Sequence, residues 1–112
     1  MGYVESVEWA KSLFSNAIEV STLEAIDTAG TYLMLDSVDG HNSVQDKAQL
    51  VLVVVGHALT GNAGVLPLLQ NHRDVILDNR HDIEFKFIKR VEMRTTTLFS
   101  VAMGFSMVVN LT

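Results

Sequence analysis

The chain of 112 residues contains no cysteine, a single proline and no long hydrophobic run. Without cysteine it cannot form disulfides, use a thiol nucleophile or ligate a metal through sulfur. A membrane-spanning helix needs about 20 apolar residues, and the longest apolar runs, such as residues 50–55, are far shorter. One proline and seven glycines leave little room for a flexible linker, so we predict a single domain over residues 1–112.

Positive charge is also scarce. Eight Lys and Arg residues stand against thirteen Asp and Glu residues, and the net charge is −5. Nucleic-acid binding needs a concentrated positive surface that neutralises phosphates, so we expect no nucleic acid among the partners. The first residues carry neither the basic stretch nor the apolar stretch of an export signal. We therefore expect an intracellular protein with no membrane partner.

Two segments have the period of an amphipathic helix. Residues 4–18 place Val7, Ala10 and Phe14 on one side, with acidic and small polar residues on the other. Residues 66–77 show the same pattern and have the only proline in their first turn, where a helix tolerates it. Both segments are therefore predicted to pack one face against a core.

Four segments are typical of β-strands: residues 31–35, 48–58, 83–93 and 99–111. Both faces of the second are apolar, which predicts a central strand covered on both sides. In the last, every odd position from Phe99 to Leu111 is apolar, and the mostly small even residues allow another surface to lie close. The polar residues 36–47, with the turn pair Asp39-Gly40, predict a long hairpin loop. Residues 20–30 have no clear assignment.

The resulting element order is α-β-β-α-β-β. It predicts an α+β domain in which two helices pack on one face of a mostly antiparallel sheet. An open sheet of this kind leaves edge strands, and unpaired edges invite pairing with another chain.

Motifs for catalysis or for cofactor binding are not found. The four histidines have no metal-ligand spacing, and no serine-nucleophile elbow occurs, so we expect no metal, no cofactor and no enzymatic activity. His72, on the apolar face of the second helix, is interpreted as a satisfied core or interface histidine. His57 ends the central strand, and a catalytic role for it in a cleft stays open as an alternative.

Two features favour contact with other macromolecules. Trp9 lies off the apolar side of its helix, and it is either an interface anchor or a side chain folded onto its own sheet. A group of bases between residues 86 and 94 is either a solvated strand face or a contact with an acidic partner, including a neighbouring copy of this acidic chain. The candidate interface residues are Trp9, Asp36, Asp39, His41, Lys47, Lys86, Lys89, Arg90 and Arg94.

The order of these elements resembles the tail terminator family, small tail-completion proteins of tailed bacteriophages. The matching pieces are the helix 4–18, the hairpin 31–58, the helix 66–77 and the strand pair 84–111. The closing segment Phe105-Ser106-Met107-Val108-Val109-Asn110-Leu111 looks like the final strand of that family. The scarcity of proline and the short region between the first helix and the first strand depart from the family pattern.

The resemblance implies a ring, usually hexameric, that caps the tail tube, stops its polymerisation and presents a surface to the head connector. The implied partners are therefore further copies of this chain, the tail tube and the connector. The implied locations are the cytoplasm of the host cell and the assembled virion. An alternative is a small-ligand-binding or regulatory α+β domain that dimerises through its sheet edges. A third reading is a small enzyme that uses His57 beside a pocket of Met and Phe residues.

Overall fold

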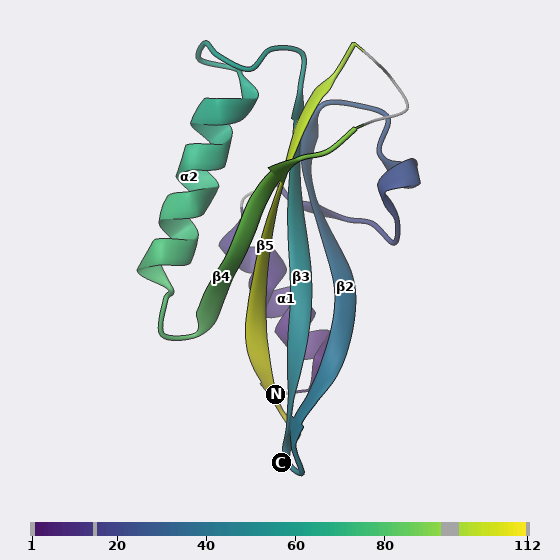
Figure 1. The fold of residues 1–112 in the computed structure, drawn as a ribbon, viewed down its shortest axis with the longest axis vertical. Helices are drawn as coiled ribbons and strands as arrows, with labels where there is room; N and C mark the ends of the chain where they lie inside the picture. Colours follow the sequence, from purple (N-terminus) through teal and green to yellow (C-terminus); the bar gives the residue numbers. More distant parts are fainter. Residues whose placement is uncertain (1, 15, 93–96, 112) are drawn as a thin grey trace.

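The computed structural model describes residues 2–14, 16–92 and 97–111. One five-stranded sheet runs in the order β1-β2-β3-β5-β4 and carries two α-helices (Figure 1), which confirms the α+β class. The elements are α1 (Tyr3–Leu13), β1 (Ile18–Glu19), the 3-10 helix η1 (Leu23–Ala25), β2 (Gly30–Asn42), β3 (Gln45–Gly56), α2 (Val65–Asp78), β4 (Ile83–Arg90) and β5 (Phe99–Asn110).

The sheet is mixed, which corrects the prediction of a mostly antiparallel sheet. β1 pairs parallel with β2, placing Ile18 opposite Tyr32 and Glu19 opposite Leu33, while the other neighbouring strands pair antiparallel. The element order also gains β1 and η1, so it differs from the predicted α-β-β-α-β-β. β1 has two residues, too few to show the alternation by which a strand is recognised in a sequence.

The prediction of a long hairpin loop over residues 36–47 is also wrong. β2 continues to Asn42 and β3 begins at Gln45, so only two residues separate the strands. The ladder is shifted twice, between Leu35 and Ser37 and between Gly40 and Asn42. Pairing between strands satisfies the backbone N–H and C=O groups of a residue whatever its side chain is. The polar residues therefore extend the hairpin instead of ending it.

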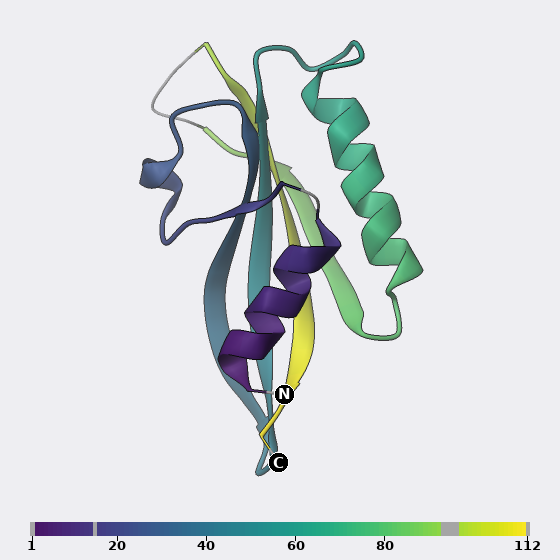
Figure 2. The same ribbon diagram turned by 180° about the vertical axis from the view of Figure 1, so that it is seen from behind.

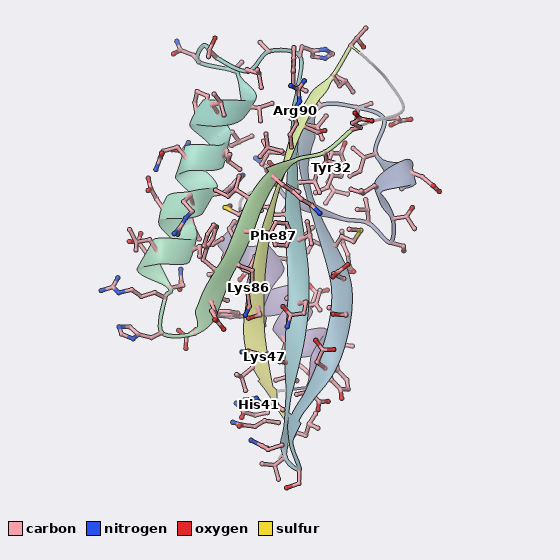
Figure 3. The ribbon with its side chains drawn as sticks, viewed as in Figure 1. Tyr32, His41, Lys47, Lys86, Phe87 and Arg90 are labelled. Atoms are coloured by element: carbon pink, nitrogen blue, oxygen red, sulfur yellow. The ribbon has the colours of Figure 1, made fainter. Side chains whose placement is uncertain are left out.

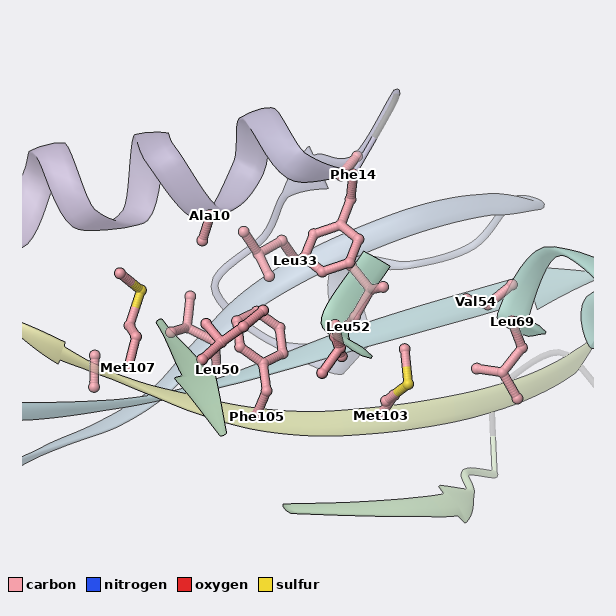
Figure 4. Packing of buried hydrophobic residues seen from close by; sticks show 14 of the residues in the cluster. Ala10, Phe14, Leu33, Leu50, Leu52, Val54, Leu69, Met103, Phe105 and Met107 are labelled. Carbon is pink, nitrogen blue, oxygen red and sulfur yellow. The ribbon is translucent and has the colours of Figure 1, made fainter. Parts of the chain in front are cut away.

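The main core lies between the two helices and one face of the sheet, called here the helix face (Figure 2). Phe14, which follows α1, and Leu69 of α2 belong to the same buried cluster as Leu52 and Val54 of β3 (Figure 4). β3 is the middle strand, and it is buried from Leu50 to Gly56. The prediction of a central strand with two apolar faces is therefore confirmed.

The opposite face of the sheet, called here the front face, is covered only in part. The chain between β1 and β2 crosses one end of it, where Leu23 and Ile26 pack with Tyr32, Val53 and neighbouring apolar side chains. The other end, toward the β2–β3 turn, carries no helix (Figure 1). The front face therefore combines a small apolar core with an open surface.

β5 shows why its even positions are small. Its odd residues from Val101 to Val109 face the helices, whereas Gly104 lies on the front face beneath the ring of Phe87 on β4. A Cβ atom built on Gly104 would lie 2.2 Å from Cε2 of Phe87. The missing side chain of Gly104 therefore makes the space that the Phe87 ring occupies.

We expect Gly104→Ala to displace the Phe87 ring and to lower the free energy of unfolding by about 1 to 3 kcal/mol, the usual cost of overpacking. In a Phe87→Ala background the same change should be neutral or stabilising, because alanine loses less backbone entropy than glycine in a strand. Urea denaturation of the four variants of this double-mutant cycle measures the coupling. Equal effects of Gly104→Ala in both backgrounds would contradict the contact.

Candidate interaction surfaces

The outer edge of β2 is open over most of its length. β1 pairs only with Tyr32 and Leu33, and in the described chain no strand pairs with the outer side of β2 from Met34 to Asn42. This stretch, called here the acidic edge, carries two aspartates and no Lys or Arg. Both aspartates, Asp36 and Asp39, are exposed, so the open edge presents negative charge to solvent.

The opposite edge of the sheet is β4, and it has the opposite charge. All five residues of its second half, Lys86 to Arg90, are exposed, and three of them are basic. This stretch is called here the basic edge. The Lys89 ammonium lies 5.2 Å from the centre of the Phe87 ring, and the Arg90 guanidinium lies 5.6 Å from that of Phe99. These cations therefore rest on aromatic rings at the rim of the sheet.

Between the two edges, a three-residue ion cluster crosses the front face. Nζ of Lys47 lies 3.1 Å from one carboxylate oxygen of Glu84, and Nζ of Lys86 lies 3.3 Å from the other. The hydrogen bonds from these ammonium groups, that of Lys47 first, lower the pKa of Glu84. Among the described residues Lys89 and Arg90 form no ion pair, so they hold the uncompensated positive charge of the basic edge.

The structure brings most of the predicted interface residues onto or beside this front face (Figure 3). Asp36 and Lys86 line one shallow hollow of about 290 Å³. His41 and Lys47 line another of about 200 Å³. Trp9 is not part of this group, because it is half-buried on α1 and packs against the main core. Arg94 lies outside the described residues.

An apolar groove that the sequence did not predict lies beside the acidic edge. A hollow of about 460 Å³ on the helix face is lined by residues of α1, β2 and the chain after α1, among them Val4, Val7 and Leu35. Val4 is 73% exposed and Leu35 is 42% exposed. The apolar residues at the start of α1 were the signal available, but periodicity alone assigns such residues to a core.

The histidines occupy different surroundings. His72 is buried, its Nε2 lies 3.2 Å from the Thr31 hydroxyl, and its ring meets Phe14 edge-on at 5.4 Å. Of the two alternatives, a satisfied core or interface histidine, the structure shows the core histidine. His57 follows β3 and is exposed. No group of three or more His, Asp or Glu residues within the described ranges is placed to hold a metal ion.

Neither helix in the described part of the chain is long and apolar enough to span a membrane. Comparison with protein family models gives no match, and comparison with curated proteins gives none either. The geometry of the two edges and the groove is therefore the basis for inferring function.

Burial lowers the pKa of His72, which makes the stability of the fold depend on pH. The unfolded chain takes up a proton as the pH falls through the usual histidine value of 6.5, whereas the folded chain resists it. Stability is therefore full above that pH and falls below it. We expect His72→Gln, which keeps a polar partner for Thr31, to lose part of this dependence.

The measurement is urea denaturation of both proteins at about pH 7.5 and about pH 5.5. The wild type should lose more free energy of unfolding between the two pH values than the His72→Gln variant. An exposed-site control, His57→Gln, should behave as the wild type. Identical pH profiles for the wild type and His72→Gln would refute a neutral, buried His72.

Proposed function

We propose that this chain is a structural assembly protein of the phage tail-terminator type. Its copies form a ring that caps a tail tube and joins it to the head connector, in the cytoplasm of the host cell and then in the virion. It works by fitting surfaces together, and it makes and breaks no covalent bond. The observation that carries the proposal is one sheet with two open edges of opposite charge.

Opposite charges favour a ring over a two-fold dimer. In a two-fold dimer a surface patch meets itself, so pairing through either edge brings like charges together, and like charges directly opposite are destabilising. A head-to-tail contact instead sets the acidic edge of one copy against the basic edge of the next, with Asp39 on the same face as Lys89. Such contacts repeat from copy to copy and close into a ring when the rotation between copies allows it.

The element order supports the same proposal. The structure contains the helix, hairpin, second helix and strand pair on which the tail terminator resemblance is based. However, β1 and η1 come between the first helix and the hairpin, and a two-residue turn replaces the long polar loop. In a closed head-to-tail ring every copy has the same orientation, so the two ends of the ring present different surfaces. This suits contact with a tube at one end and a connector at the other. Charge complementarity then sets orientation and register more than affinity.

The alternative is a small-ligand-binding or regulatory domain that dimerises through its sheet edges. The groove of about 460 Å³ between α1 and β2 favours it, because small-molecule sites are concave and mostly apolar. Against it, the charge of each edge opposes pairing with its own kind. A dimer in solution whose melting temperature rises with apolar ligands would support this reading.

The test is light scattering coupled to size-exclusion chromatography over a range of protein concentrations. We expect a closed species of about six copies at high concentration. Raising the salt from about 0.1 M to about 1 M shortens the screening length from about 10 Å to about 3 Å, so the ring should weaken. A mass that stays monomeric or dimeric at every concentration would contradict the ring.

A further inference from the structure

We infer that the acidic edge of one copy pairs with the basic edge of the next copy as adjacent antiparallel strands, forming a continuous intermolecular sheet. This inference rests on the proposed ring and names the surfaces that close it. The partner at each edge is a second copy of this chain. Three independent features of the structure agree on this contact: strand direction, the character of each face, and the groove beside the acidic edge.

Strand direction is the first feature. β2 is antiparallel to β3, β3 to β5, and β5 to β4, so β2 and β4 run in opposite directions within one copy. When a copy is repeated around a ring with its helix face always on the same side, its β2 meets a β4 that runs the opposite way. The contact is therefore antiparallel, like the three main pairings inside each copy.

The two faces of the edges also match. On the front face, Asp39 lies opposite Lys47 in the ladder and Lys89 lies opposite Ala102, so both charged residues stand on the same side of the continuous sheet. When the two edges lie side by side, Asp39 of one copy and Lys89 of the next are on the same face of the continuous sheet. Opposite charges across a strand pair stabilise it, whereas like charges oppose it.

On the helix face each of the same edges presents at least one exposed aliphatic side chain, and Arg90 stands on this face at the end of the basic edge. Val38 lies opposite Ala48 and Ile88 opposite Met103, and both Ala48 and Met103 belong to the main core. Val38 is 40% exposed and Ile88 is 45% exposed in the single copy. Pairing the edges removes these apolar surfaces from water, which is favourable in proportion to the area buried.

The apolar groove is the third feature, because it adjoins the acidic edge on the helix face. It is lined by Val4, Val7 and Leu35 among others, and no part of the described chain fills it. A strand added outside β2 carries one row of its side chains toward the groove. We assign Ile88 of the second copy to it, since Ile88 is the exposed aliphatic residue of the helix face on the basic edge.

Within one copy, the acidic edge and the basic edge lie at different positions along the strand direction. Val38 is in the same row as Ile83, whereas Ile88 is in the same row as Leu33. Joining the acidic edge to the basic edge therefore displaces neighbouring copies along the strands. In a closed ring such a displacement inclines the strands to the ring axis, as shear does in β-barrels.

The absence of native cysteine allows a direct test by cross-linking. Val38→Cys and Ile88→Cys are made as two separate proteins, mixed, and treated with a short bismaleimide. We expect a dimer that contains one copy of each variant, formed several-fold faster than in either variant alone. In the control mixture Leu77→Cys replaces Ile88→Cys, because Leu77 is similarly exposed, at 51%, but lies on α2.

Charge reversal gives a second and independent readout. We expect the pair Asp36→Lys and Asp39→Lys to abolish the ring seen by light scattering, and the pair Lys89→Glu and Arg90→Glu to do the same. All four changes in one chain should restore the ring, because the edges are again complementary. Mixing the two double variants should also restore it, whereas a change that merely unfolds the chain cannot be rescued.

The outcomes separate this inference from the proposed ring. A ring that forms without the Val38–Ile88 cross-link and withstands both charge reversals overturns the edge pairing and leaves the ring in place. The cross-link in an assembly that stays open upholds the edge pairing and overturns the closed ring. A cross-link within Val38→Cys alone that forms as fast as in the mixture overturns the head-to-tail pairing in favour of two-fold dimers.

Discussion

The burial of β3 on both faces is the constraint on which the other elements depend. An extended segment such as Leu50–Val55 has apolar side chains on both faces, so it is buried from solvent only if other parts of the chain cover both faces of the sheet. On one side the cover is the pair of helices, through Phe14 and Leu69. On the other it is the chain between β1 and β2, through Leu23 and Ile26. Because β3 takes the centre, β2 and β5 flank it and the outer edges are left open.

The charges on the open edges can prevent uncontrolled strand pairing and can also select one particular pairing. Natural proteins place charged residues and bulges on edge strands to prevent uncontrolled pairing. The register of β2 shifts at Asp36 and that of β4 shifts at Lys86, so both devices are present on both edges. Because the two edges carry opposite signs, the same charges that discourage pairing of an edge with itself leave one complementary pairing available.

Several parts of the fold were predictable from the sequence, and each has a local cause. The central strand followed from the apolar run at residues 50–55, and both helices followed from their period, although α1 ends at Leu13 rather than near residue 18. The hairpin arm was misread because its polar side chains resemble a loop, whereas ladder hydrogen bonds join backbone groups. β1 was not predicted because a strand of two residues is too short to show the alternation of apolar and polar residues.

The residues of the candidate interaction surface were also predictable only in part. Asp36, Asp39 and Lys89 could be selected from the sequence as charged residues, and the core or interface role of His72 followed from its place on an apolar helix face. The groove at Val4 was not predictable, because an apolar residue at a helix start has the same local pattern whether a core or solvent faces it.

The sequence by itself determined which segments bury apolar surface and which carry charge, since both properties belong to the side chains and their spacing. Only the tertiary structure decided that the acids of β2 and the bases of β4 stand on opposite edges of one sheet. Strand order depends on contacts between residues far apart in the chain, such as the pairing of β3 with β5. Those contacts are decided by the packing of the whole core, which no local pattern contains.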